Sequence, residues 1–317
     1  MRKLLIAAIA TMILAAPTQA GWFSNYFQYT KTKHPIVLVP GIFAFDTIAG
    51  IDYWYQIPSA IENRGGKVFV PRINAFDSSV ERGEQLIAQL DEIVAGSRGK
   101  ITQFNLIGHS QGGITSRYVM AARPDLVVSV TTMATPHTGS PVADIVTGIA
   151  PEGTVQADLL AVVGNAIGNL VNLLSNNSAS ESDVYAMLGE FNEVGSANFN
   201  ASFPLGLPSQ ECGEGPSSVN VEGNNIKLFS LGGDAAITTG LDPSDVLFAA
   251  SSLAFQGAPS DGVTGVCASH FGLVLRDDYM MNHLDITNQV LGLVSILETN
   301  PKTIFKNHAN RLKNMGL

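Results

Sequence analysis

One serine of this chain stands where a nucleophile would be expected. Ser110 lies in the sequence GHSQG, which matches the pattern G-x-S-x-G, between the apolar run Phe104–Ile107 and a helical stretch from Gly112 to Arg123. A strand, a tight glycine-flanked turn and a helix in this order raise a serine hydroxyl above a sheet at the amino end of a helix. Backbone N–H groups stabilise a developing oxyanion there. The pattern therefore predicts a nucleophilic serine, and the alternative is an inert serine in a structural turn.

A nucleophilic serine needs a base, and the base needs a carboxylate to orient it. Four histidines follow Ser110. His137 comes too soon after the serine and is expected to pack or to form hydrogen bonds. His308 lies in a terminal stretch rich in Lys and Asn and is expected to be solvated. His283 lies in a polar loop, where a side chain is well presented, and its position favours it only modestly over His270.

Spacing alone leaves the acid open between two aspartates. Asp234 comes soon after the apolar run Ile226–Leu231, as an acid at the end of a strand would. Asp261 lies on a Ser-Asp-Gly turn six residues before Cys267, where a disulfide could hold the loop in place. Both aspartates therefore remain candidates.

The donors of an oxyanion hole are predicted from two turns. The run HPIVLV is followed by Pro40, Gly41 and Ile42. Proline has no N–H group and glycine permits a close approach of the backbone. The amide of Ile42 is therefore the expected donor in this loop, and the amide of Gln111 is the second.

Apolar strand-length runs alternate with helical stretches. Continuous rather than alternating hydrophobicity is typical of strands buried on both faces of a parallel sheet. A helix is expected to begin after Ser78, because Ser78 and Glu81 form a capping-box pattern. The order of elements predicts an α/β fold with a mostly parallel sheet covered by helices. The expected strands are His34–Val39, Lys67–Val70, Phe104–Ile107, Leu126–Met133 and Ile226–Leu231.

The first twenty residues have the features of a signal peptide. Arg2 and Lys3 precede the apolar run Leu4–Ala16, and small residues stand before the expected cleavage site after residue 20. Such a run is too short for a bilayer span. The mature chain, 21–317, is therefore expected to be secreted. Export also favours a disulfide between Cys212 and Cys267, the only two cysteines.

Composition and charge narrow the class of protein. Basic residues number 18 and acidic residues 27 in the 317-residue chain, and no basic cluster occurs, so nucleic-acid binding is not expected. Neither a repeat nor a linker divides the chain, which predicts one domain with a helical cap within roughly 141–205. Inside the cap, Val155–Leu174 is amphipathic with a nearly uncharged polar face. It is predicted to be either a core helix or a lid that meets lipid.

Several motifs in order resemble one family. GHSQGG at 108–113, LDPSD at 241–245, DG at 261–262, NHLDITNQV at 282–290 and HANRLK at 308–313 are similar to those of the secreted, foldase-dependent bacterial triacylglycerol lipases. The resemblance covers essentially the whole mature chain. It implies an α/β-hydrolase fold and hydrolysis of triacylglycerol esters at lipid–water interfaces through an acyl-enzyme. One departure is visible, because many members have His-Gly where this chain has Pro40-Gly41.

The resemblance also implies the roles of individual residues. It makes Ser110 the nucleophile, His283 the base and Asp261 the acid. The amides of Ile42 and Gln111 fall on the family's oxyanion hole. The disulfide falls on Cys212 and Cys267, in agreement with the expectation from export.

A structural calcium ion is implied as well. Its expected ligands are the carboxylates of Asp242 and Asp285 and the backbone carbonyls of Gln289 and Leu293. Carboxylate and carbonyl oxygens are the ligands that Ca²⁺ prefers. Bound there, the ion would tie the loop of His283 to a distant segment.

The resemblance further implies two partners, a membrane-anchored foldase in the periplasm and an outer-membrane secretion machinery. A monomer is expected. The alternatives are a short-chain carboxylesterase with the same triad and, with less support, a non-catalytic exported lipid-binding protein.

Overall fold

The computed structural model describes residues 26–42, 52–148, 165 and 187–317. The expected signal peptide, 1–20, lies outside the described residues. The expected lid helix, Val155–Leu174, also lies outside them except for residue 165, and only the ends of the expected cap are described.

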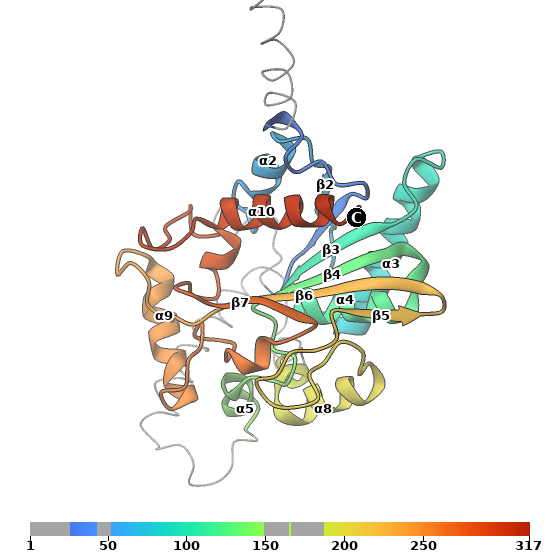
Figure 1. The fold of residues 1–317 in the computed structure, drawn as a ribbon. Helices are drawn as coiled ribbons and strands as arrows, with labels where there is room; N and C mark the ends of the chain where they lie inside the picture. Colours follow the sequence, from blue (N-terminus) through green and yellow to red (C-terminus); the bar gives the residue numbers. More distant parts are fainter. Residues whose placement is uncertain (1–25, 43–51, 149–164, 166–186) are drawn as a thin grey trace, which may run out of the picture.

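A seven-stranded sheet, in the order β2-β1-β3-β4-β6-β5 with β7 also paired to β6, forms the centre of the described chain (Figure 1). Every pairing is parallel except that of β5 with β6. The predicted α/β fold with a mostly parallel sheet is therefore confirmed. The strands are β1 (Ile36–Val39), β2 (Val68–Phe69), β3 (Phe104–His109), β4 (Val127–Met133), β5 (Ser218–Val221), β6 (Asn224–Gly233) and β7 (Leu273–Tyr279).

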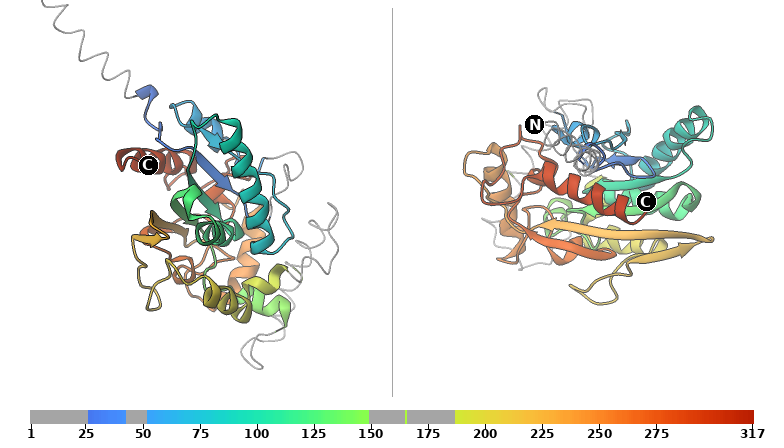
Figure 2. Two further views of the ribbon diagram at one scale, coloured as in Figure 1. Left: turned by 90° about the vertical axis from the view of Figure 1, so that its right-hand side faces the viewer. Right: turned by 45° about the horizontal axis from the view of Figure 1, so that its top comes forward.

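Helices cover both faces of the sheet, as the views in Figure 2 show. Among the described residues, no helix is long and apolar enough to cross a membrane. The helices are α2 (Ile57–Glu62), α3 (Ser79–Gly96), α4 (Gln111–Ala122), α5 (Pro141–Thr147), α8 (Glu193–Ser202), α9 (Pro243–Ser252) and α10 (Pro301–Asn314).

The alternation of side chains along β1 explains how the two layers are held. Ile36 and Leu38 point into a core shared with α2 and α10, whereas Val37 and Val39 point into a second core shared with α3 and α4. All four side chains are buried. Burial on both faces accounts for the continuous apolar run, because a strand under two helical layers has no solvent-facing side.

The start of α3 is fixed by the predicted capping box. The Ser78 side chain accepts a hydrogen bond from the Glu81 amide, and the Glu81 carboxylate accepts one from the Ser78 amide. The box satisfies two backbone donors that would otherwise lack a partner. It fixes the point where α3 begins, and with it the position of Arg82, whose contacts are described below.

Candidate active site

Ser110 occupies a strained turn between β3 and α4. Its backbone has φ 54° and ψ −128°, a conformation that non-glycine residues rarely adopt. The flanking glycines are required by crowding: a Cβ on Gly108 would lie 2.2 Å from the Gly112 carbonyl oxygen, and one on Gly112 would lie 2.1 Å from the Val39 carbonyl oxygen. The predicted strand–turn–helix arrangement around Ser110 is therefore present.

The loop after β1 lies directly against this turn. A Cβ on Gly41 would be 2.7 Å from the Ser110 Cβ, so the backbone next to Ile42 passes within contact of the serine. The Gln111 amide stands at the start of α4, where helix geometry leaves N–H groups without an intrahelical acceptor. Both amides predicted as oxyanion donors thus lie in segments that adjoin the serine.

A buried arginine on α3 holds the loop after β1. Arg82 donates from Nη2 to the Pro40 carbonyl oxygen at 2.5 Å and from Nη1 to the Asn74 carbonyl oxygen at 2.6 Å. Burial lowers the pKa of Arg82 to about 10, and the charges of Asp77 and Glu190 partly oppose that shift. The guanidinium still carries its charge at neutral pH, and it holds the backbone of the loop after β1 through the Pro40 carbonyl oxygen.

His283 and Asp261 form a buried pair. His283 Nδ1 lies 2.7 Å from Asp261 Oδ2, and each side chain is 1% exposed. Asp261 Oδ1 accepts further hydrogen bonds from the amides of Val263 and Thr264. These contacts fix the position of the carboxylate, and a carboxylate bonded to Nδ1 orients the His283 ring with Nε2 free.

The second ring nitrogen of His283 has no hydrogen-bond partner among the described residues, although it is buried. The Ser110 hydroxyl therefore does not hydrogen-bond to it in this structure. The two residues are nevertheless neighbours in space, because the rings of His283 and His109 lie 4.7 Å apart and His109 precedes the serine. Hydrogen bonds of this kind are often long before substrate binds.

A tyrosine and a histidine connect the oxyanion loop to the serine turn. The Tyr53 hydroxyl accepts a hydrogen bond from the Gly41 amide at 2.8 Å and lies 2.5 Å from His109 Nδ1. Burial, and then the charge of His283, hold the pKa of His109 well below its usual value, so its ring is neutral. The hydroxyl can therefore donate to Nδ1. Nothing in the sequence pattern pointed to Tyr53 or to a role for the His109 ring.

The backbone of His283 is fixed by its neighbour Asn282. The Asn282 amide group donates to Ser244 Oγ and to Asp245 Oδ1, and its carbonyl oxygen accepts from the amides of Leu284 and Asp285. Burial acts to raise the pKa of Asp245, but hydrogen bonds from the backbone of the loop before α9 outweigh it and lower the pKa. Both residues lie within quoted motifs, and only their contacts show what they hold.

The other acid candidate lies elsewhere. Asp234 follows β6, and its amide donates to the Tyr279 carbonyl oxygen. Burial raises its pKa, and the nearby carboxylate of Asp278 raises it further. The carboxylate that contacts His283 in the structure is therefore Asp261.

The remaining histidines are bound away from the serine. His137 contacts Arg117 and Thr132 and stacks on Phe271, in line with the expected packing role. The expectation that His308 is solvated is wrong. Its Nε2 lies 2.7 Å from Thr131 Oγ1, and burial lowers its pKa to about 3. The expectation fails because α10 is amphipathic: its Lys and Asn residues made the whole stretch look solvated, whereas His308 lies on the buried face of the helix.

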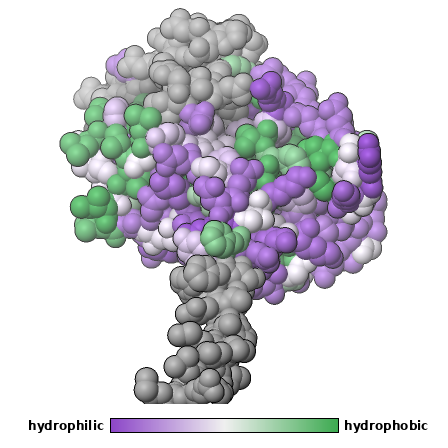
Figure 3. Space-filling view, turned by 90° about the horizontal axis from the view of Figure 1, so that it is seen from above, coloured by the Kyte–Doolittle hydropathy of each residue, from purple (hydrophilic) through white to green (hydrophobic). Residues whose placement is uncertain are grey.

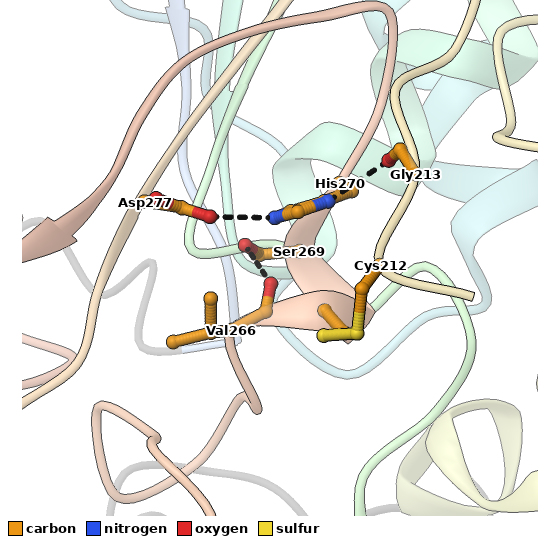
Figure 4. The surroundings of a disulfide bond; sticks show 7 residues. Cys212, Gly213, Val266, Ser269, His270 and Asp277 are labelled. Carbon is orange, nitrogen blue, oxygen red and sulfur yellow. Dashed lines mark hydrogen bonds and ion pairs between the residues drawn. A yellow bond between two sulfur atoms is a disulfide. The ribbon is translucent and has the colours of Figure 1, made fainter.

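His270 belongs to the surroundings of the disulfide (Figure 4). Cys212 and Cys267 are bonded, as expected from their number and from export. The His270 ring bridges the Gly213 carbonyl oxygen and the Asp277 carboxylate, each at 2.9 Å. These two hydrogen bonds join the disulfide loop to β7. Because they occupy both ring nitrogens, His270 has none left to act as a base.

Two of the expected calcium ligands lie together. Burial raises the pKa of Asp285 to about 7, and the nearby charge of the Asp242 carboxylate contributes to this rise. One oxygen of each, Asp242 Oδ2 and Asp285 Oδ1, is buried without a partner among the described residues. Unpaired, buried carboxylate oxygens of this kind fit a hard divalent cation.

The two expected backbone ligands are less closely defined. The Gln289 carbonyl oxygen accepts a hydrogen bond from the Leu291 amide, which leaves it a second lone pair. Leu293 is partly exposed. No group of three or more His, Cys, Asp or Glu side chains suited to a metal occurs in the described parts of the chain. The ion would therefore depend on backbone oxygens in addition to the two carboxylates.

Comparison with known proteins identifies the family. Residues 34–209 match the family description of the α/β hydrolase fold. The chain is 43% identical, over 320 aligned residues, to a triacylglycerol lipase of Vibrio cholerae, and the match covers 100% of both chains. The chain belongs to the triacylglycerol lipase family. The predicted lipase family, fold and enzyme class are thereby confirmed, whereas secretion and dependence on a foldase stay predictions.

Further relatives of this lipase carry the same name. A triacylglycerol lipase of Burkholderia plantarii is 35% identical over 91% of this chain and 88% of its own. One of Pseudomonas fragi is 33% identical over 90% and 98%. A solved Bacillus licheniformis lipase in its mature form has a TM-score of 0.57 at 17% identity over 90% of this chain and 93% of that one, which shows the shared fold.

Proposed function

We propose that this lipase hydrolyses the ester bonds of triacylglycerols at lipid–water interfaces through Ser110, His283 and Asp261. One observation supports this most directly: the buried His283–Asp261 pair stands beside the strained turn of Ser110. A carboxylate-bound imidazole next to a serine at a helix start is the arrangement that acyl transfer requires. The names of the relatives support triacylglycerol as the substrate.

The proposed first half-reaction forms an acyl-enzyme. The Ser110 oxygen attacks the ester carbonyl carbon while His283 Nε2 takes the hydroxyl proton. The amides of Ile42 and Gln111 stabilise the resulting oxyanion. When the tetrahedral intermediate collapses, His283 gives its proton to the leaving alcohol oxygen, and the acyl group stays on the serine.

The second half-reaction releases the fatty acid. His283 takes a proton from water, whose oxygen attacks the acyl carbonyl, and the proton then returns to the Ser110 oxygen as the carbon–oxygen bond breaks. Asp261 keeps the Nδ1 proton in place and stabilises the imidazolium during both steps. Arg82 and Tyr53 support the oxyanion loop through its backbone.

Replacement of the serine tests the proposal. Ser110→Ala should lower kcat by roughly 10⁶-fold, as removal of a nucleophile does in serine hydrolases. Ser116→Ala is the matched control, because Ser116 lies on the same helix and its hydroxyl donates to the Gly112 carbonyl oxygen of that helix. Hydrolysis of p-nitrophenyl esters and emulsified triolein measures both. Activity retained by Ser110→Ala would contradict the mechanism.

A structural calcium ion is part of the proposal. The carboxylates of Asp242 and Asp285, with the backbone carbonyls of Gln289 and Leu293, would hold it. When bound, the ion would neutralise two buried carboxylates and tie the segment before α9 to the loop of His283. The partnerless carboxylate oxygens support this assignment.

The cellular path of the protein is proposed on the sequence alone. Residues 1–20 would direct export and be removed, and a membrane-anchored foldase would assist folding in the periplasm. A secretion machinery would then release the mature monomer, in which the cap within 141–205 would carry the lid. Refolding of the mature chain with and without its foldase, followed by measurement of the recovered activity, would test this dependence.

A further inference from the structure

An exposed apolar surface lies outside the two cores. Figure 3 shows apolar side chains gathered on the left of the molecule, the side on which Figure 1 places α9 and the loop before α10. We call this surface the outer apolar face. The most exposed apolar side chains of the loop after β6, of α9 and of the loop before α10, from 55% to 97% exposed, are Ile237, Leu241, Val246, Leu291, Ile296 and Leu297. Contiguous apolar patches are uncommon on proteins that have no partner for them.

The outer apolar face lies at the edge of the sheet that carries the active site. Ser110 follows the carboxyl end of β3, and the segment with Ile237 and Leu241 follows the carboxyl end of β6. The loop with Ile296 and Leu297 follows β7. Because β3, β4, β6 and β7 are parallel, their carboxyl ends meet at one edge. A surface that meets this face therefore also meets the edge of the sheet at which Ser110 stands.

The loop that carries Ile296 and Leu297 is anchored on both sides. Glu298 accepts hydrogen bonds from Arg276 at 2.7 Å and from the Met280 amide at 3.2 Å. The Ser295 hydroxyl contacts the sulfur of Met280 at 3.5 Å. Ile296 is 97% exposed and Leu297 is 83% exposed between these anchors. Folding therefore holds two adjacent apolar side chains in water.

Charge indicates what would cover the outer apolar face. The stretches 246–260 and 286–297 contain no charged residue, although the whole chain carries a net charge of −9. Transfer of these segments to an apolar phase therefore desolvates no ionised side chain. The charged groups beside this face are paired with one another, since Arg276 binds both Asp278 and Glu298. The exposed Ile and Leu side chains gain nothing from an ionic partner, whereas hydrocarbon accepts them favourably.

We propose that the outer apolar face docks this lipase on the surface of neutral lipid and so presents its active site to emulsified ester. The proposal rests on the proposed function, and it names a binding surface separate from the triad and from the predicted lid helix. Ile296 and Leu297 enter the lipid first, because they are the most exposed pair.

The test compares binding with hydrolysis. Ile296→Ser/Leu297→Ser, in the Ser110→Ala background, should bind triolein droplets coated with phosphatidylcholine roughly ten-fold or more weakly than Ser110→Ala alone in a flotation assay. With Ser110 present, the double variant should show a raised apparent KM on the same emulsion. Its kcat/KM on dissolved p-nitrophenyl butyrate should equal that of the unsubstituted lipase.

Two further variants make the test specific. Leu241→Ser/Val246→Ser alters the same face at α9 and should weaken droplet binding likewise. Phe27→Ser/Met315→Ser removes exposed apolar side chains near the two described ends of the chain and should bind as the unsubstituted protein does. These ends are joined near the amino end of β1, where the Lys313 ammonium donates to the Gln28 carbonyl oxygen.

The outcomes separate the docking surface from the proposed function. Unchanged droplet binding by both variants of the face would overturn the proposal, as would an equal loss in the Phe27/Met315 control. A dimer that the double variant dissociates would assign the face to a second copy and overturn it too. If the unsubstituted protein failed to cleave the dissolved ester, the proposed function would fail. The binding comparison in the Ser110→Ala background would still decide the docking surface.

Discussion

At the scale of single residues, contacts rather than residue types separate the roles. Asp234 and Asp261 are both aspartates that lie near a strand end or a turn, and spacing could not choose between them. In the structure Asp261 receives two backbone amides and contacts His283, whereas Asp234 lies near the charged end of β7. A carboxylate can orient a histidine only within hydrogen-bond distance.

The matched pair Asp261→Asn and Asp234→Asn should therefore differ sharply. Asp261→Asn is expected to lower kcat by about 10⁴-fold, because an amide no longer holds the catalytic tautomer of His283. Asp234→Asn should change kcat little. Steady-state hydrolysis of p-nitrophenyl butyrate gives both values, and an equal loss in the two variants would argue against Asp261 as the acid.

Tyr53 is expected to position the oxyanion loop. Tyr53→Phe removes one oxygen, which leaves the Gly41 amide without its acceptor and His109 Nδ1 without a donor. We expect kcat to fall by roughly ten-fold or more, since an unsatisfied buried polar group costs about 1–3 kcal/mol, with a smaller change in KM.

Tyr55→Phe is the control for Tyr53→Phe, because it makes the same chemical change in the same turn. The backbone carbonyl of Tyr55, which accepts a hydrogen bond from the Asn288 side chain, is unaffected by the substitution. A fall in kcat that both variants share would indicate a general loosening of the turn. Equal kcat for Tyr53→Phe and the unsubstituted lipase would contradict the positioning role.

At the scale of elements, the start of α9 and the loop of His283 are joined as one unit. Asn282 joins them through Ser244 and Asp245, and the proximity of Asp242 and Asp285 brings them together again a few residues away. The first connection needs no metal, whereas the second places two buried carboxylates together. These hydrogen bonds therefore hold the loop of His283, and the proposed ion would hold it further.

Removal of calcium should accordingly loosen this unit. With EDTA, we expect the melting temperature to fall by several degrees and activity to fall with it, and calcium should restore both. Asp242→Asn should have a lower melting temperature than the unsubstituted lipase and should respond little to EDTA. Thermal melts of the two proteins with and without chelator decide the matter. If the unsubstituted protein melted at the same temperature with and without EDTA, the result would count against the metal site.

At the scale of the whole molecule, buried histidines couple the fold to pH. His308 joins α10 to β4 through Thr131, and its folded pKa of about 3 lies below its usual value of 6.5 because it is buried. Between these values the unfolded chain binds the proton and the folded chain does not. The contribution is thus complete above about pH 6.5 and is lost as pH falls toward 3.

His308→Gln should flatten this dependence. Glutamine can still hydrogen-bond to Thr131 and does not titrate, so the free energy of unfolding of the variant should fall less between pH 6.5 and pH 4. Urea unfolding at each pH measures the difference in slope. His34→Gln is the control. Burial lowers the pKa of His34 too, but this histidine is less buried than His308, so its replacement should change the slope less. Parallel pH curves for His308→Gln and the unsubstituted protein would refute the coupling.

The overall architecture was within reach of the sequence, because strands buried on two faces and a capped helix leave local patterns. The five expected strands are present, with somewhat shifted ends, as β1, β2, β3, β4 and β6, and so is the helix that begins after Ser78. β7 was missed because its second half, Arg276–Tyr279, is charged and polar, and β5 was missed because it is short and only partly buried.

The sequence by itself determined the serine turn, the cysteine pair and the α/β order, because tight turns, cysteine number and buried strands depend on neighbouring residues. Only the tertiary structure decided that Asp261 contacts His283, that Tyr53 joins Gly41 to His109, and that His308 is buried. These contacts join residues that are far apart in the chain. Their geometry exists only when the carboxyl ends of parallel strands are brought to one edge of the sheet and α10 is packed against it.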